Sequence, residues 1–249
     1  MITKIELYTR INQLFNKAGF DFRRFPNPSF RLLLKYLKDN NVNECFDVGA
    51  NTGQYARRLR SLGFKGTIYS FEPQSEAFNI LNKKAASDSQ WKPFNIGLGN
   101  ANEKSVINIS KNSVSSSILD INRYLLETAP ETEYISKEKI DIRRLDTFLK
   151  EENFQGRFFL KIDAQGFESK ILEGAENCFN NIYALQIESS CVPLYKQEKL
   201  FDEMKAFIES KGFYLSSLES GFSDPVSGRL LQVEMIFLRE VKTIHNLST

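Results

Sequence analysis

A glycine-containing bend near the start of the chain joins a short apolar run to a helical pattern. The bend reads DVGANTG, from Asp47 to Gly53, and the helical pattern follows over residues 54–62. In a parallel α/β sheet, a strand that turns through glycines into a helix brings bare backbone against a nucleoside. The bend therefore predicts a parallel α/β sheet with a nucleoside-containing ligand at the carboxyl end of its first strand.

A second apolar run follows and ends in an acidic residue. Residues 67–71 read TIYSF, and Glu72 and Pro73 come directly after them. An acid about 20 residues beyond such a bend is placed to accept hydrogen bonds from ribose hydroxyls. The bend and Glu72 together predict the site, with Gly49 and Gly53 bringing the backbone close to the ligand.

The bend differs from the G-x-G-x-x-G pattern that binds the pyrophosphate of NAD. It lacks the third glycine, and Asp47 lies close to where a phosphate would have to bind. An unpaired carboxylate there would repel a pyrophosphate but attract a cationic amino group. S-adenosylmethionine (SAM) has ribose, adenine and an ammonium group but no phosphate, so the bend favours SAM. The alternative is a tight turn that Asp47 merely caps.

The composition excludes several classes of protein. The chain has 249 residues, 41% of them hydrophobic, which is enough for one substantial core. Its 33 Lys and Arg residues nearly balance 31 Asp and Glu residues, which disfavours a nucleic-acid partner. No apolar run approaches the roughly 18 residues of a membrane span, and the N-terminus lacks a signal-peptide core. The three cysteines have no C-x-x-C spacing, so we expect a cytoplasmic protein without disulfides or a zinc site.

Strand-like and helical patterns alternate along the chain, which predicts a mostly parallel sheet with helices on both faces. Residues 1–40 are predicted as an N-terminal helical extension of the same domain, residues 41–241 as its main part and residues 242–249 as a tail. The expected strands are residues 45–48, 67–71, 93–96, 158–162 and 184–188. The expected helices are residues 54–62, 75–86, 167–179 and 198–211.

The last two strand-like runs, residues 213–218 and 231–238, are too close together for a crossover helix. The connection contains turn residues, so the last strand must run antiparallel to the one before it. A SAM methyltransferase sheet closes with such a reversed strand, whereas an NAD-type sheet normally ends parallel. Residues 106–109 and 139–142 predict an accessory strand pair. Residues 112–137 between them form a long polar loop, suited to a lid or a substrate-binding segment.

The order of these motifs resembles the FkbM family of methyltransferases over nearly the whole chain. The matching stretches include FDVGANTGQYARRLRSLGFKG, YSFEPQSEAF, FLKIDAQGFESKILEGAE and GFSDPVSGRLLQVE, of which K-I-D-x-Q-G-x-E is the most specific. The resemblance implies a Rossmann-like class I methyltransferase fold. It also implies SAM-dependent O-methyl transfer to a hydroxyl of a small molecule, typically a sugar or glycan precursor or a secondary metabolite.

The resemblance also implies roles for residues by position. The residues expected to bind SAM are Asp47, Gly49, Asn51, Gly53 and Glu72, with Asn95 and Gly97 bordering the adenine. The main departure from the family pattern is Glu234, where aspartate is expected. This change can alter a contact in the pocket.

Methyl transfer displaces a neutral thioether, so the protein must mainly position the reactants and remove the hydroxyl proton. The single histidine, His245, follows the last strand and is poorly placed to do so. Ligands of open α/β sheets bind beyond the carboxyl ends of the strands, where Lys161, Asp163 and Glu188 lie. We expect Asp163 to take the proton, and Lys161 and Glu188 to shape the acceptor pocket. A purely structural Lys161–Asp163 ion pair is the alternative.

Three further possibilities stay open from the sequence. Asp163 and Glu188 are compatible with Mg²⁺ but do not demand it, so no metal ligand is assigned. An NAD-dependent dehydrogenase is disfavoured by the bend and by the reversed last strand. A non-catalytic SAM-binding protein would keep Asp47 and Glu72 but lose the groups near Asp163, which are present here.

Overall fold

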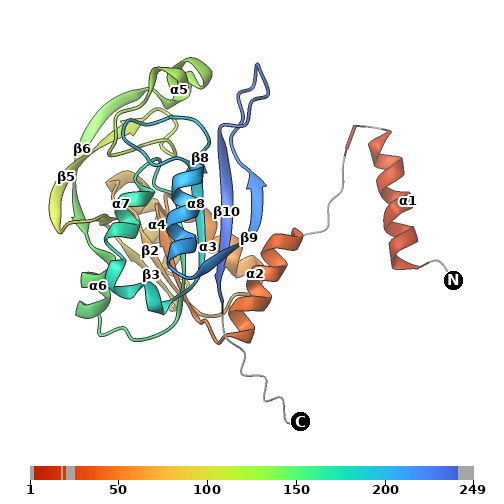
Figure 1. Ribbon diagram of the computed structural model, residues 1–249, viewed down its shortest axis with the longest axis horizontal. Coiled ribbons are helices and arrows are strands. Elements are labelled where there is room, and N and C mark those ends of the chain that lie inside the picture. Colours follow the sequence, from red (N-terminus) through yellow and green to blue (C-terminus); the bar gives the residue numbers. More distant parts are fainter. Residues whose placement is uncertain (1–2, 18, 21–25, 241–249) are drawn as a thin grey trace, which may run out of the picture.

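A seven-stranded sheet forms the centre of the molecule in the computed structural model, which describes residues 3–17, 19–20 and 26–240. Its strands are β1 (Glu44–Val48), β2 (Thr67–Phe71), β3 (Trp91–Phe94), β7 (Phe158–Ile162), β8 (Ile182–Ser190), β9 (Phe213–Ser220) and β10 (Gln232–Arg239). The strand order is β3-β2-β1-β7-β8-β10-β9 (Figure 1). Strands β3, β2, β1, β7 and β8 of this sheet run parallel, and β10 is antiparallel to both β8 and β9. The expected mostly parallel sheet with a reversed last strand is confirmed.

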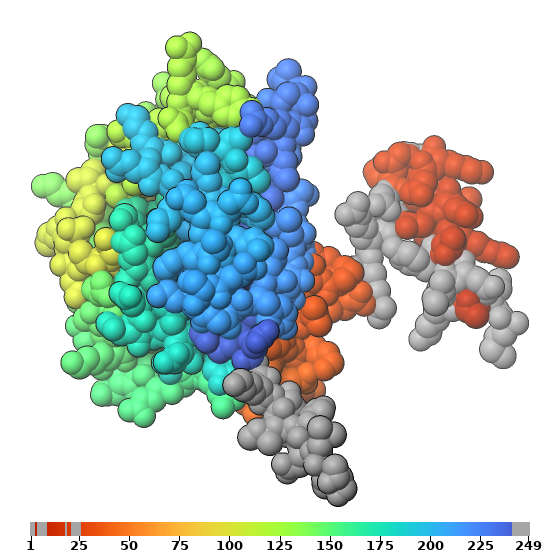
Figure 2. All heavy atoms as spheres, viewed as in Figure 1, coloured from red at the N-terminus to blue at the C-terminus, as the bar shows by residue number. Residues whose placement is uncertain are grey.

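Helices cover both faces of this sheet because side chains alternate between the faces along each strand. On β1, Cys45 packs in an apolar cluster with helices α2 (Pro28–Asp39), α3 (Gln54–Ser61) and α4 (Ser75–Ala85). The next residue, Phe46, packs on the opposite face. That face is covered by helices α6 (Leu145–Glu151), α7 (Glu168–Glu173) and α8 (Phe201–Ser210). Figure 2 shows the side chains around α8, in light blue, closing over the sheet from the near side.

A smaller sheet stands beside the central one and holds the accessory strand pair. It consists of β4 (Gly97–Leu98), β5 (Glu103–Ser110) and β6 (Tyr134–Arg143), in the order β4-β6-β5. Val106 pairs with Lys139 in an antiparallel ladder, as the sequence predicts. Between β5 and β6 the chain forms helix α5 (Arg123–Thr128) and a short 3₁₀ helix, η1 (Pro130–Thr132). The expected structureless loop is therefore partly helical, because Leu125 and Ala129 bury apolar surface against Leu194 and Tyr195.

Several predicted boundaries differ from the structure, and three of them have a clear physical context. Strand β3 begins at Trp91, before the predicted residue 93, because Trp91 pairs with Ile68 and is buried. Helix α7 ends at Glu173, after which Gly174 passes so close to Gly99 that a side chain would not fit, and a 3₁₀ helix, η2 (Glu176–Asn181), follows. Helix α8 begins at Phe201 rather than at residue 198.

The N-terminal extension contains helix α1 (Lys4–Asn16) as well as α2. Ile11 and Leu14 of α1 are exposed, whereas Phe30, Leu33 and Leu37 of α2 are buried against the sheet. Within the described residues, no helix combines the length and the apolar character needed to cross a membrane.

The bend after β1 packs directly on the end of β7. Gly49 has φ +72°, and a Cβ atom there would lie 1.8 Å from the carbonyl oxygen of Asp163. Gly63 has φ +92°, but nothing lies within 4 Å of its Cβ position. The two glycines therefore share a left-handed backbone but differ in available space.

We expect Gly49→Ala to destabilise the fold much more than Gly63→Ala. Alanine in left-handed conformation costs roughly 1–2 kcal/mol at either position, but only at position 49 must the two strand ends also separate. Urea denaturation of both variants measures the difference in the free energy of unfolding. Equal losses would show that the close approach of Gly49 to Asp163 is not needed.

Candidate functional site

A cavity of about 350 Å³ opens at the carboxyl ends of β1, β2 and β7, where open α/β sheets bind ligands. Its walls come from the bend after β1, the first turns of α3, the residues after β2, and the segment 113–118. The ends of β7 and β10 complete them. Among the residues predicted as a site, the lining includes Gly49, Asn51, Glu72, Gly97, Lys161 and Asp163. It does not include Asp47, Gly53, Asn95 or Glu188.

The bend is held against the end of β2 by backbone hydrogen bonds. The N–H groups of Gly49 and Ala50 both donate to the carbonyl of Phe71, each over 3.0 Å. Gly53 has φ +82° and precedes α3, and a Cβ there would lie 2.7 Å from the ring of Trp91. Gly49 therefore faces the cavity, while Gly53 allows the helix to pack on Trp91 behind it.

Glu72 lies on the cavity wall with both carboxylate oxygens engaged. One oxygen accepts the backbone N–H of Asn51 over 2.7 Å, and the other accepts that of Gln74 over 2.8 Å. Burial raises the pKa of Glu72 to about 7, although these two N–H groups lower it. Asn95 donates to the backbone carbonyls of Glu72 and Pro73, so it braces this turn from outside the cavity.

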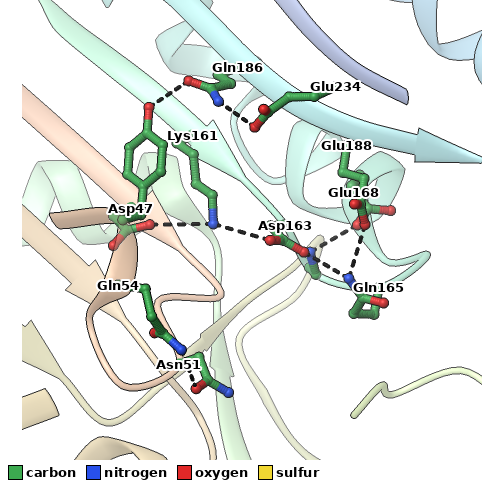
Figure 3. A network of polar contacts seen from close by, with 12 residues as sticks. Asp47, Asn51, Gln54, Lys161, Asp163, Gln165, Glu168, Gln186, Glu188 and Glu234 are labelled. Atoms are coloured by element: carbon green, nitrogen blue, oxygen red, sulfur yellow. Dashed lines mark hydrogen bonds and ion pairs between the residues drawn. The ribbon is translucent and has the colours of Figure 1, made fainter. Parts of the chain in front are cut away.

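A buried polar row crosses the sheet beneath the cavity (Figure 3). Asp47 is adjacent in register to Ser70 on one side and to Lys161 on the other. It is fully buried: Oδ2 accepts the Ser70 hydroxyl over 3.2 Å, and Oδ1 lies 3.5 Å from the Lys161 ammonium without accepting a hydrogen bond. Asp47 therefore differs from an unpaired carboxylate, because the Lys161 ammonium lies beside it, and its side chain is not part of the cavity lining.

Lys161 is the centre of this row. Its ammonium lies 3.5 Å from carboxylate oxygens of both Asp47 and Asp163, and 5.3 Å from the centroid of the Tyr55 ring. Burial lowers the pKa of Lys161, but the carboxylates of Asp163 and Asp47 outweigh it and raise the pKa above its ordinary value. Lys161 therefore stays protonated and is unsuited to accept a proton.

Asp163 is the carboxylate of the row that reaches the cavity. Its side chain is 40% exposed, and it accepts a hydrogen bond from Gln165 Nε2 over 2.8 Å in addition to the contact with Lys161. Gln165 also donates to Glu188 over 3.0 Å, and Gln232 donates to the same Glu188 oxygen over 2.8 Å. Glu188 thus lies behind Gln165, outside the cavity lining, and contacts Asp163 only through it.

The environment of Glu188 favours its neutral form. Burial raises the pKa of Glu188 well above its ordinary value, and the charges of Asp163 and Glu168 raise it further. Burial also raises the pKa of Glu168 to about 7. Glu168 accepts the backbone N–H groups of Ala164 and Gly166, which holds the turn after β7 in shape. Of these acids, Asp163 is the one on the cavity wall.

Gln165 is a site residue that sequence reasoning did not single out. Its side-chain oxygen accepts the Tyr195 hydroxyl over 2.8 Å, and its backbone carbonyl accepts the Ser117 hydroxyl over 2.7 Å. The only available signal was its place in the K-I-D-x-Q-G-x-E motif. Gln165 has φ +52° and the next residue, Gly166, has φ +95°, so the turn holds the amide against Asp163.

The far end of the cavity is lined by Tyr55 and Arg58 from α3 and by Glu234 from β10. The Tyr55 hydroxyl donates to Gln186 over 2.5 Å, and the Gln186 amide donates to Glu234 (Figure 3). The suspected effect of Glu234 on a pocket contact is consistent with this placement. Sequence reasoning did not single out Tyr55, Arg58 or Gln186, although Tyr55 and Arg58 lie within the family-like stretch FDVGANTGQYARRLRSLGFKG.

Within the described part of the chain, no group of three or more His, Cys, Asp or Glu side chains is arranged to hold a metal ion. Asp163 and Glu188, the pair considered for Mg²⁺, are bridged by the Gln165 amide. His245 lies outside the described residues.

Comparison with known proteins identifies a family and finds several similar proteins. The methyltransferase FkbM domain family matches residues 47–215. A curated protein named chaperone protein HtpG, from Alkaliphilus metalliredigens (strain QYMF), is 24% identical over 225 residues. That match covers 90% of this chain but 30% of the chaperone, so the chain spans less than a third of that protein's length.

Three solved structures are similar to this chain at low sequence identity. A putative RNA methyltransferase from Pyrococcus horikoshii is 15% identical with a TM-score of 0.45, over 89% of this chain and 88% of that one. M. capricolum TrmK in complex with S-adenosylhomocysteine is 13% identical with a TM-score of 0.48, over 84% of this chain and 67% of that one. Magnesium protoporphyrin IX methyltransferase from Synechocystis PCC 6803, with bound SAM, is 9% identical with a TM-score of 0.47, over 94% of this chain and 97% of that one.

We expect Lys161→Met to lower the free energy of unfolding by about 3–5 kcal/mol, the usual cost of leaving one buried charge without its partner. Arg123→Met is the matched control, because it removes a cation from an ion pair with Glu127 in which both side chains are largely exposed. Urea denaturation at neutral pH should show a large loss for the first variant and almost none for the second. Similar small losses in both would contradict a compensating role for Lys161.

Proposed function

The chain belongs to the FkbM methyltransferase family, and from this premise we propose that it transfers a methyl group from SAM to a hydroxyl of a small molecule. The acceptor we favour is a sugar or glycan precursor or a secondary metabolite. The observation that carries the proposal is a single cavity with Glu72 at one end and a partly exposed carboxylate, Asp163, further along the same wall.

The residues around the first part of the cavity fit SAM. Glu72 has its oxygens fixed by two backbone N–H groups and can accept from ribose hydroxyls. Gly97 lies on the wall beyond Glu72, where an adenine would border it, and Gly49 brings bare backbone to the middle. No lining residue requires a phosphate partner there. SAM supplies, when bound, a methyl group on a positively charged sulfur.

Asp163 is the group we propose as the proton acceptor. It lies on the cavity wall, and Lys161 and Gln165 hold its carboxylate in place. The leaving thioether needs no acid, so the protein must orient the acceptor and take one proton from its hydroxyl. Orientation contributes roughly 7–11 kcal/mol of barrier lowering in favourable cases, and a positioned base typically adds 10²–10⁴-fold in rate.

Glu188 and Lys161 then have supporting roles in this proposal. A neutral Glu188 accepts from Gln165 and so orients the amide that donates to Asp163. Lys161 stays charged, and its ammonium lies 3.5 Å from the Asp163 carboxylate and helps to hold it in place. The near balance of charges over the whole chain favours a small acceptor over a nucleic acid.

Asp163→Asn should reduce methyl transfer by about 10²–10⁴-fold, because the amide cannot accept the proton. The affinity for SAM should stay nearly unchanged. Calorimetry with SAM and a transfer assay with labelled methyl donor and a panel of hydroxylated sugars measure both quantities. Asp120→Asn, whose side chain is 66% exposed, is the control and should behave like the native protein. Full activity of Asp163→Asn would show that Asp163 is not the base. If the native protein binds SAM but transfers no methyl group to any acceptor, a non-catalytic SAM-binding role is favoured instead.

The affinity for SAM should depend on pH through Glu72. Its pKa is raised to about 7 in the free protein, and ribose hydroxyls donate best to the ionised form. Binding should therefore be strongest above pH 7 and weaken by up to about tenfold for each pH unit below it, since SAM must then displace a proton. Calorimetry between about pH 5.5 and 8 tests this. Glu72→Gln should bind more weakly and lose this pH dependence; an unchanged profile in that variant would assign the dependence to another group.

A further inference from the structure

We propose that the acceptor carries an acidic group, a carboxylate or a phosphate, and that Arg58 binds this group. The inference rests on the proposed function, because it assigns the acceptor end of the same cavity. Arg58 belongs to α3 and lines the cavity together with Tyr55 and Glu234. Four observations support it: the distance from Glu72, the contact of the guanidinium with an aromatic ring, the lack of a direct ion pair among the described residues, and the acids on the same cavity wall.

The Arg58 end of the cavity lies far from the ribose-binding end. Glu72 follows β2, whereas Glu234 lies on β10, and the strands β1, β7 and β8 separate them in the sheet. Four steps of about 4.8 Å between neighbouring strands place these two positions roughly 19 Å apart. A SAM molecule with its ribose at Glu72 and its reactive end near Asp163 leaves the region of Arg58 and Glu234 for the acceptor.

The guanidinium of Arg58 is held in position by an aromatic ring. Its central carbon lies 4.1 Å from the centroid of Phe30, a buried residue of α2. Stacking of this kind occupies the flat face of the guanidinium and leaves its N–H edge available for a planar or tetrahedral anion. The neighbouring Tyr55 ring also packs near Phe30, with 6.1 Å between the ring centroids. Helix α2 thus supports this end of the cavity.

Burial raises the pKa of Glu234 and the charge of Arg58 partly offsets this, but Arg58 forms no direct ion pair in the part of the chain that the structure describes. No described carboxylate lies within 4.0 Å of its guanidinium, whereas Arg60 of the same helix pairs with Asp88 over 2.7 Å. Lys161, the other cation on the cavity wall, already lies beside Asp47 and Asp163. Arg58 is therefore the lining cation that can pair with an anionic ligand at little cost.

The acids at this end of the cavity determine how the bound acceptor is oriented. Glu234 accepts from Gln186, and Asp163 lies nearer the middle of the cavity. Both repel an anion, so an acidic group avoids them and is stabilised only at Arg58. The rest of the acceptor then extends toward Asp163, with a hydroxyl within reach of its carboxylate. Charge thus selects both the class of acceptor and its orientation.

The test compares two variants on three probes: glucuronate, glucose 6-phosphate and glucose. Arg58→Gln removes the cation on the cavity wall, while Arg57→Gln removes its exposed neighbour on the same helix, which does not line the cavity. Binding of each probe is measured by calorimetry in the presence of S-adenosylhomocysteine, and methyl transfer is measured with labelled SAM.

We expect the native protein to prefer at least one acidic probe over glucose by about tenfold or more, the usual scale of a charge-assisted hydrogen bond. Arg58→Gln should bind the acidic probe only about as well as it binds glucose, whereas Arg57→Gln should keep the preference for the acidic probe. A preference for glucuronate or for glucose 6-phosphate identifies the acidic group as a carboxylate or a phosphate.

The outcomes separate this inference from the proposed function. Methyl transfer to neutral and acidic probes with equal efficiency would overturn the role of Arg58 and leave the proposed function standing. Binding of acidic probes without any transfer would count against the proposed function, while the contrast between Arg58→Gln and Arg57→Gln would still support the anion site. Acidic probes that do not bind, or bind equally to the native protein and Arg58→Gln, overturn the inference.

Discussion

The buried ion pair between Asp47 and Lys161 is the interaction on which the site depends. The two residues are register partners on β1 and β7, and burial of either charge alone would be costly. The pair therefore favours one alignment of these strands. That alignment brings Gly49 and Asp163, each two residues further along its strand, into direct backbone contact at the rim of the cavity. A slip of one strand by one residue would turn its polar side chain toward the apolar cluster on the opposite face.

The same pair divides the acids near the cavity into different chemical states. Asp47 and Asp163 share the ammonium of Lys161, so the lysine stays charged. Glu188 is favoured in its neutral form, because burial and the charges of Asp163 and Glu168 outweigh the charge of Lys161. An acceptor hydroxyl in this cavity would meet the partly exposed carboxylate of Asp163, which a cation and an amide hold in place. Neighbouring carboxylates with such different environments are what acid–base chemistry needs.

The FkbM resemblance and the pattern of apolar runs together predict much of this architecture. The parallel strands, the reversed β10, the bend at Gly49 and the placement of Glu72 at the cavity all follow from patterns a few residues long. Predicted boundaries are wrong where a distant contact overrides the local pattern. Glu198 is an example: its pattern predicts a helix, but its carboxylate accepts the backbone N–H of Tyr195 and the hydroxyl of Ser190, and α8 starts later.

By itself, the sequence determined which residues end the strands, because alternation and turn residues act over neighbouring positions. Only the tertiary structure decided which of those residues face a ligand. Asp47 and Asp163 are both acids near the end of a strand, yet one lies beneath the cavity against Lys161 and the other on its wall. Arg58 and Gln165 have the pattern of ordinary polar residues, and it is packing that places them beside Phe30 and Asp163. Burial and charge compensation arise between strands and helices far apart in the chain, and no local pattern encodes them.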